Sequence, residues 1–287
     1  MDHVEYALVA LMSRGNPAVV ANYGNDTVSV LVNSGAGTFA PKVDYPTGST
    51  PSSVALGDVD GDGKLDLVVA NNGSSTVSVL VNSGTGTFAP KVDYPTGSTP
   101  YSVALGDVDG DGKLDLAVAT SVLVNSGTGT FAARVDYLTG GSPSSVALGD
   151  VDGDGKLDLV VANEYSDAVS VLVNGGTGTF ATPVDYPTGT LPSSVALGDV
   201  DGDGKLDLVV ANSGGNTVSV LMNSGPETFA PKVDYPHGTP ATLYGGGRRG
   251  RGRQARPRGC RRHRRERARE RRPCLRSGVA AGPRART

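Results

Sequence analysis

The sequence predicts an all-β protein built from about five repeated four-stranded antiparallel sheets. An acidic segment of the 287-residue chain, Asp58-Val-Asp-Gly-Asp-Gly-Lys-Leu-Asp66, returns at residues 107, 150 and 199, in steps of 49, 43 and 49 residues. A period of this length marks a repeat architecture in which each unit is one supersecondary block. Valine-rich segments without a 3.6-residue periodicity, separated by turns rich in glycine, proline, asparagine and serine, favour strands over helices.

One unit contains four expected strands. Ser53–Gly57 ends at the acidic segment, and Leu65–Ala70 follows it. Thr76–Val81 comes after a turn-rich gap, with alternating side chains, and Thr87–Tyr94 ends the unit before Pro-Thr-Gly. Four antiparallel strands in about 49 residues are typical of a β-propeller blade, whereas a turn of the competing solenoid geometry needs only about 20–30 residues.

These repeats divide residues 1–245 into five expected blades, which span residues 1–50, 51–99, 100–142, 143–191 and 192–240. In the first unit, Asn16–Asn22 aligns with Leu65–Asn71, but Val9, Leu11, Ser13 and Pro17 occupy the positions of the carboxylates, so we expect no metal there. The third unit lacks six residues between its second and third strands. We therefore predict a shortened or merged hairpin and a less stable blade.

The four acidic segments predict hard-cation sites, with calcium as the first candidate. Four carboxylates within nine residues repel one another at neutral pH unless a cation lies among them. Asp58, Asp60 and Asp62 alternate along the loop, and Gly63 allows a sharp backbone turn at low steric cost. All expected ligands are oxygens, which suits calcium rather than zinc or copper, and a wrapped, ligand-rich loop disfavours the strict octahedral geometry of magnesium.

Each loop is expected to supply four aspartate side chains and one lysine main-chain carbonyl, with the lysine side chain left in solvent. The predicted ligands are Asp58, Asp60, Asp62, Lys64, Asp66; Asp107, Asp109, Asp111, Lys113, Asp115; Asp150, Asp152, Asp154, Lys156, Asp158; and Asp199, Asp201, Asp203, Lys205, Asp207. An EF-hand does not fit, because the twelfth loop positions hold valine instead of glutamate. Solvated acidic turns are the alternative, and four intact copies argue against them.

The charge is divided unequally along the chain, which the net charge of −3 conceals. Residues 1–247 contain 27 acidic and 9 basic side chains, and sixteen of those acids lie in the four loops. Nucleic-acid binding by this part is therefore not expected.

No stretch approaches the ~18–20 apolar residues of a membrane span. The short apolar run Ala7–Met12 is at best a weak signal peptide, because no basic region precedes it.

The segment 246–287 differs from the rest in composition. It is rich in arginine, and we expect it to be disordered because glycine, proline and like charges do not form a core. Plausible codons for Arg253–Arg258, read one base later, encode Gly-Lys-Leu-Asp-Leu-Val, so we infer a frameshift near residues 241–247. The alternative is a basic arm that binds nucleic acid or acidic glycans. Cys260, Cys274 and His263 lack the paired spacing of a zinc site.

The chain resembles the FG-GAP/VCBS repeats of integrin-alpha-like propellers. The matching phrases are Val-Ala-Leu-Gly-Asp-Val-Asp-Gly-Asp-Gly-Lys-Leu-Asp-Leu and the later Gly-Thr-Phe-Ala-Pro, over roughly residues 16–240. The resemblance implies a propeller with Ca²⁺ in the hairpin between the first and second strands of a blade, held by the aspartates above. It also implies extracellular or cell-surface adhesion or ligand recognition. Such propellers commonly have seven blades, so an incomplete ring, completed in a larger propeller or multidomain protein, is an open alternative.

We predict a non-catalytic calcium-binding module whose ligand is an unidentified protein or carbohydrate. His3 and His237 lie near the ends of the body, without a serine or cysteine partner that recurs. The aspartates of the repeated Val-Asp-Tyr phrase are expected to stabilise the blades, and the tyrosines of the same phrase either pack between blades or stack on carbohydrate. The variable turns, Tyr23–Asp26, Asn72–Ser75, Glu164–Asp167 and Ser213–Asn216, are the expected ligand surface. An accessory domain of a secreted polysaccharide-acting enzyme and a non-functional fragment of a degraded repeat gene are the alternatives.

Overall fold

The structure, a computed structural model, describes residues 9–10, 17–35, 37–84, 86–118, 120–226 and 228–238. These residues belong to one compact unit, Met1–Pro240. The predicted tail, with Cys260, Cys274 and His263, lies outside the described residues. So does most of the segment of the first unit that replaces the acidic loop. Among the described residues, no helix has the length and apolarity that a membrane crossing requires.

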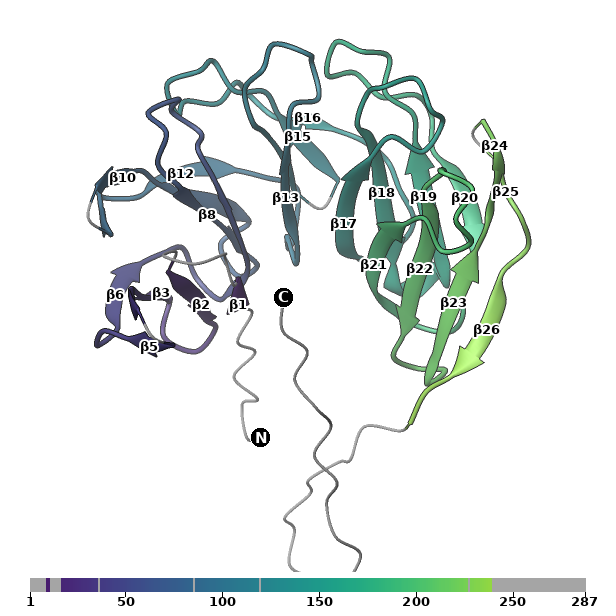
Figure 1. Ribbon diagram of the computed structural model, residues 1–287, viewed down its shortest axis with the longest axis horizontal. Coiled ribbons are helices and arrows are strands. Elements are labelled where there is room, and N and C mark those ends of the chain that lie inside the picture. Colours follow the sequence, from purple (N-terminus) through teal and green to yellow (C-terminus); the bar gives the residue numbers. More distant parts are fainter. Residues whose placement is uncertain are drawn as a thin grey trace, which may run out of the picture. The chain divides into compact units, whose positions relative to one another are not determined.

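Five four-stranded antiparallel sheets make up the described fold and confirm the predicted all-β propeller class (Figure 1). The first sheet joins β1 (Val9–Ala10), β2 (Ala18–Asn22), β3 (Thr27–Leu31) and β6 (Val43–Pro46). The second joins β7 (Pro51–Gly57), β8 (Asp66–Asn71), β9 (Thr76–Leu80) and β12 (Val92–Pro95). The third joins β13 (Val103–Gly106), β14 (Asp115–Val118), β15 (Ser121–Leu123) and β16 (Val135–Asp136). The fourth joins β17 (Pro143–Gly149), β18 (Asp158–Asn163), β19 (Ala168–Leu172) and β20 (Val184–Pro187). The fifth joins β21 (Pro192–Gly198), β22 (Asp207–Asn212), β23 (Thr217–Leu221) and β26 (Val233–Pro236).

The fourth strand of a unit is interrupted, which corrects the continuous strand expected over Thr87–Tyr94. Only β12 joins the second sheet, while β11 (Thr87–Phe88) pairs with β10 (Asn82–Gly84) in a separate hairpin. Pro90 lies between them and has no backbone N–H to donate to a strand partner. The same small hairpin recurs as β4 (Asn33–Gly35) with β5 (Thr38–Phe39) and as β24 (Asn223–Gly225) with β25 (Thr228–Phe229).

The third sheet has the shortened hairpin that the missing residues predict. Val118 of β14 pairs directly with Ser121 of β15, so a two-residue connection replaces the longer turn of the other sheets. The fourth sheet instead places a 3-10 turn, Glu164–Ser166, between its second and third strands.

The core lies between consecutive sheets. Strand contacts join β2 to β7, β7 to β13, β13 to β17 and β17 to β21. The second strand of each interior sheet is apolar on both faces because each face meets a neighbouring sheet. In β8, Val68 and Ala70 pack toward the third sheet, while Leu67 and Val69 pack toward the first. All four side chains are fully buried. This explains the continuous Leu-Val-Val-Ala runs, which contain no polar alternation.

The repeated Val-Asp-Tyr aspartate stabilises its sheet, as the sequence predicts. In the second sheet, Asn71 Nδ2 donates to Ser78 Oγ, which donates to Asp93 Oδ1 at 2.6 Å. The main-chain N–H of Gly48, from the preceding connection, also donates to Ser78 Oγ. The serine is completely buried, and its hydroxyl hydrogen is directed at a carboxylate. The network therefore links strands and sheets.

Candidate metal centres

Each acidic loop connects the first and second strands of a sheet. The four connections are β7–β8, β13–β14, β17–β18 and β21–β22. In the first loop, Gly61 and Gly63 have φ of +82° and +84°, a left-handed conformation that favours glycine. The glycine expected to make the sharp turn, Gly63, does so, and Gly61 makes a second one. The backbone of the other three loops repeats both conformations.

The first aspartate of each loop organises the backbone around itself. Asp58 Oδ1 accepts hydrogen bonds from the N–H groups of Gly61 (2.8 Å) and Asp62 (3.1 Å), and Asp58 Oδ2 accepts one from Gly63 (2.7 Å). The chain therefore wraps around this carboxylate. Asp107, Asp150 and Asp199 accept the equivalent hydrogen bonds in their loops.

Three carboxylate oxygens converge in every loop. One oxygen from each member of a group lies within 4.8 Å of the others. The groups are Asp58, Asp60, Asp62; Asp107, Asp109, Asp115; Asp150, Asp152, Asp158; and Asp199, Asp201, Asp203. Calcium–oxygen distances of 2.3–2.6 Å place two ligands of one ion at most about 5 Å apart. The spacing of these oxygens is therefore compatible with a shared metal ion.

The remaining predicted ligands lie outside these three-residue groups. In the first and fourth loops, the last aspartate, Asp66 or Asp207, is not in the group. In the second and third loops the third aspartate, Asp111 or Asp154, is the one left out. The carbonyl oxygens of Lys64, Lys113, Lys156 and Lys205 stay predicted ligands.

The last aspartate anchors the loop in the protein interior. Asp66 is fully buried, and its two oxygens accept hydrogen bonds from the N–H groups of Val59 (2.9 Å) and Asn82 (2.7 Å). Burial is the main cause that raises the pKa of Asp66, and the charges of Asp60 and Asp58 raise it further. Burial likewise raises the pKa of Asp115 and Asp158. A divalent cation beside these carboxylates favours their ionised form and so opposes that shift.

The lysine side chain of each loop is exposed, as the sequence predicts, and it also forms an ion pair within its loop. Lys64 Nζ forms an ion pair with Asp62 Oδ2, and Lys113, Lys156 and Lys205 repeat the pair in their loops. The hydrogen bond from Lys64 is the main cause that lowers the pKa of Asp62. One positive charge per loop thus offsets part of the repulsion among four carboxylates.

The asparagine after the third strand recurs in every unit, and the sequence reasoning missed its role. Asn125 Nδ2 donates both to the carbonyl of Leu114 (3.0 Å) and to the carbonyl of Val59 (2.8 Å), which lies in the loop of the preceding sheet. Asn174 and Asn223 make the same pair of hydrogen bonds. The recurrence of asparagine before a Ser-Gly or Gly-Gly turn in every unit was the available signal.

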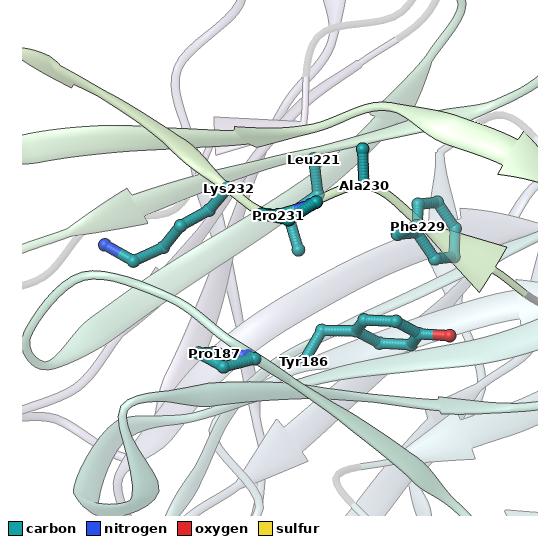
Figure 2. A pocket seen from close by; sticks show the side chains of 7 residues that line it. All are labelled: Tyr186, Pro187, Leu221, Phe229, Ala230, Pro231 and Lys232. Atoms are coloured by element: carbon teal, nitrogen blue, oxygen red, sulfur yellow. The ribbon is translucent and has the colours of Figure 1, made fainter.

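Four of the five repeated tyrosines, all except Tyr235, pack between units, as one of the two sequence hypotheses holds. Tyr186 meets Phe229 of the next unit edge-on, with ring centroids 5.2 Å apart. A mainly apolar pocket of about 430 Å³ lies beside this pair, and Figure 2 shows Tyr186 and Pro187 on one side with Phe229 and Pro231 on the other. Its charged residue, Lys232, forms an ion pair with Asp234. The pocket has no cluster of catalytic groups among its lining residues.

Comparison with known proteins assigns the repeat. A profile of FG-GAP-like repeats matches residues 14–69, 58–118, 119–161, 150–210 and 199–247. The acidic loops, their four-stranded sheets and these matches together place the chain in the FG-GAP-like repeat family. The comparison with curated proteins gave no match.

Solved structures with similar folds are distant in sequence. A proposed 6-phosphogluconolactonase from Bacteroides uniformis has a TM-score of 0.59 at 19% identity, over 79% of this chain and 70% of that chain. The periplasmic gluconolactonase PpgL of Pseudomonas aeruginosa has a TM-score of 0.55 at 21% identity, over 79% and 70%. The V. cholerae biofilm matrix protein Bap1 has a TM-score of 0.50 at 17% identity, over 81% and 40%. At these identities the similarity establishes the propeller-type fold alone.

Proposed function

We propose that this protein is a calcium-binding, non-catalytic module for adhesion or ligand recognition outside the cell. The observation that supports it best is the fourfold recurrence of three carboxylate oxygens within 4.8 Å of one another. A single acidic turn is common on protein surfaces. Four turns with the same backbone, the same glycine conformations and the same anchoring aspartate favour a functional site over ordinary acidic turns.

Calcium suits these loops better than other common cations. Every candidate side-chain ligand is a carboxylate, whereas zinc and copper prefer thiolate and imidazole ligands. The anchoring hydrogen bonds to Asp58 and Asp66 hold the carboxylates in a wrapped loop, where six to eight oxygens suit calcium. Extracellular calcium modules bind at about 10⁻⁴–10⁻³ M, a range available outside cells.

The role of calcium in this proposal is structural. Each loop ends at a strand whose first residue is the buried aspartate, so neutralising the loop stabilises the start of the second strand. Sixteen of the 27 acidic side chains of residues 1–247 lie in these loops. Bound calcium therefore removes most of the self-repulsion of the propeller and favours the folded state by mass action.

The variable turns between second and third strands are the proposed recognition surface. In an antiparallel sheet they lie at the opposite end of the strands from the acidic loops. Tyr165, in the fourth sheet, is 76% exposed, and Asp26 and Asp167 are exposed in equivalent turns. Varied polar and aromatic side chains on a fixed scaffold suit a protein or carbohydrate partner. The matrix location stated for Bap1 agrees with this role outside the cell.

The first experiment measures thermal unfolding in calcium, magnesium and EDTA, with calcium binding followed by calorimetry. We expect up to four sites and a melting temperature that rises with calcium, by an amount that magnesium does not reproduce. Asp150→Asn should remove one site, while Glu164→Gln, a change at an acid outside the loops, should remove none. A melting temperature indifferent to calcium and EDTA would refute the proposal.

A second experiment tests recognition. A panel of immobilised extracellular polysaccharides and matrix proteins is probed with the wild-type protein and with Tyr165→Ala. Leu138→Ala, a change at a 90% exposed residue outside the turns, is the matched control. We expect bound partners to lose affinity on Tyr165→Ala alone. Hydrolysis of 6-phosphogluconolactone above the buffer rate, abolished by a single substitution, would instead favour an enzyme.

A further inference from the structure

Each junction between consecutive sheets contains one aromatic pair. The pairs are Tyr45–Phe88, Tyr94–Phe131, Tyr137–Phe180 and Tyr186–Phe229, each edge-on with centroids 5.2–5.4 Å apart. The tyrosine always belongs to the earlier unit and the phenylalanine to the later one. Two equivalent residues remain outside these pairs: Tyr235 of the fifth sheet is 56% exposed, and Phe39 of the first unit is 43% exposed.

The outer face of the fifth sheet is built like the faces that are covered elsewhere. Val59, Val108 and Val151 are each at most 2% exposed, because the following sheet covers them. Their counterpart Val200 is 54% exposed. A Cβ at Gly149 would contact two leucines of the next sheet, whereas nothing lies within 4 Å of that position at Gly198. Val209, whose counterparts Val68 and Val160 are fully buried, is only partly buried.

The first sheet also has a face that no neighbouring sheet covers, and it is equivalent to the face that the later sheet contributes at an interior junction. Leu31 is partly buried, while its counterparts Leu80, Leu172 and Leu221 are at most 1% exposed. Val20 is likewise partly buried, although its counterparts Val69 and Val210 are completely buried. These residues, with Phe39, correspond to the apolar set that the later sheet contributes at every interior junction. The two exposed faces therefore carry the residue types of the two sides of an interior junction.

We propose that the outer face of the fifth sheet binds the first sheet of a second copy of this chain, head to tail. Tyr235 of one copy then meets Phe39 of the next, and Val209 packs against Val20 and Leu31, as the equivalent residues do at the interior junctions. A contact of either face with itself would oppose tyrosine with tyrosine or leucine with leucine and reproduce none of these pairings. This inference depends on the repeated packing and stands apart from calcium binding.

A head-to-tail interface is heterologous, so each copy binds one neighbour through its fifth sheet and another neighbour through its first sheet. Such contacts form a ring if the rotation closes and an open chain if it does not. The exposed residues are apolar and of the kinds that fill the interior junctions. The association should therefore be concentration-dependent and only weakly sensitive to salt.

Analytical ultracentrifugation of the full chain tests the proposal. At about 100 μM, which is a hundredfold above a micromolar Kd, we expect the wild-type protein to be dimeric or larger. Val209→Lys in the fifth sheet and Val20→Lys in the first should each give a monomer. Leu138→Lys, in the connection between the third and fourth sheets, should leave the assembly unchanged. A wild-type protein that stays monomeric would overturn the proposal.

Mixing the two lysine variants tests the direction of the contact. Val209→Lys keeps its first sheet intact, and Val20→Lys keeps its fifth sheet intact, so the mixture should form a 1:1 dimer that grows no further. A dimer formed by either variant alone would show a face-to-face contact and refute the head-to-tail arrangement. If either variant unfolds by circular dichroism, Tyr235→Lys and Phe39→Lys replace them, since both positions are already largely exposed.

Discussion

The third and fourth acidic loops have the same nine residues but different surroundings. In Asp150–Asp158, Val151 is 2% exposed, and its carbonyl accepts a hydrogen bond from Asn223 Nδ2 of the next unit at 2.7 Å. In Asp199–Asp207, the equivalent Val200 is 54% exposed, and the described residues include no such asparagine donor. Both loops nevertheless keep the same glycine conformations and bring three carboxylate oxygens together.

The difference shows that the stability of an acidic loop has a local part, which comes from the loop itself, and a second part, which depends on the following sheet. Local hydrogen bonds from the loop backbone to its first aspartate set the loop shape, and they are present in both copies. Burial of the valine and its carbonyl comes from the following sheet. In repeat proteins, stability is approximately a sum of unit terms and neighbour terms, and the two loops separate those terms.

Removing the asparagine that binds the preceding loop should have the largest effect. Asn223→Ala leaves the buried carbonyl of Val151 without its asparagine donor, and we expect a loss of about 3 kcal/mol in the free energy of unfolding. Asn82→Ala is the matched control, because Asn82 Nδ2 donates to Leu65 in its own sheet. It should cost about 1–2 kcal/mol. Urea unfolding measures both, and equal losses would contradict a contribution from the following sheet.

Truncating the loop valine should distinguish the two loops by burial. Val151→Ala removes two buried methyl groups and should cost about 2 kcal/mol. Val200→Ala should cost less than about 0.5 kcal/mol, as expected at an exposed surface position. Thermal unfolding of the two variants at low protein concentration gives the comparison. A large loss for Val200→Ala under these conditions would mean that its surroundings are covered in solution.

Calcium affinity should follow the same division. The third loop is held by a neighbour before calcium binds, so less ordering remains to oppose binding there, and we expect the fourth loop to be the weakest site. Asp201→Asn should remove the weakest class in a calorimetric titration, whereas Asp152→Asn should remove a tighter one. At calcium tenfold above its Kd, each lost site should cost about 1.4 kcal/mol of stability. Identical titrations for the two variants would contradict the division.

The smallest expected effect concerns pH in calcium-free buffer. Burial raises the pKa of Asp158 above its ordinary value of 3.8, so ionised Asp158 disfavours folding. Protonation removes this penalty as the pH falls through the raised pKa toward 3.8. The wild-type protein should therefore gain stability relative to Asp158→Asn as the pH is lowered from neutrality toward 3.8. A pH-independent difference between the two proteins would show that Asp158 has no raised pKa in the folded state.

The sequence predicted the features that are set locally. Valine alternation and turn residues located the strands, and Gly63 predicted the turn that gives the loop its shape. The sequence reasoning failed where a distant partner decides the outcome. The role of Asn125 depends on the preceding sheet, which no pattern within one unit reveals.

The short hairpin of the third sheet shows how the repeat accepts changes of length. Its pairs Leu116–Leu123, Ala117–Val122 and Val118–Ser121 are equivalent to Leu67–Leu80, Val68–Val79 and Val69–Ser78 of the second sheet. Six residues are therefore missing without any slip in pairing, because the shortening falls equally on both strands. The hydrogen bond from Ser121 to Asp136 survives as well. The end of this hairpin is consequently a natural position for grafting a foreign peptide, since a paired extension of equal arms would be displayed while the sheet beneath keeps its alignment.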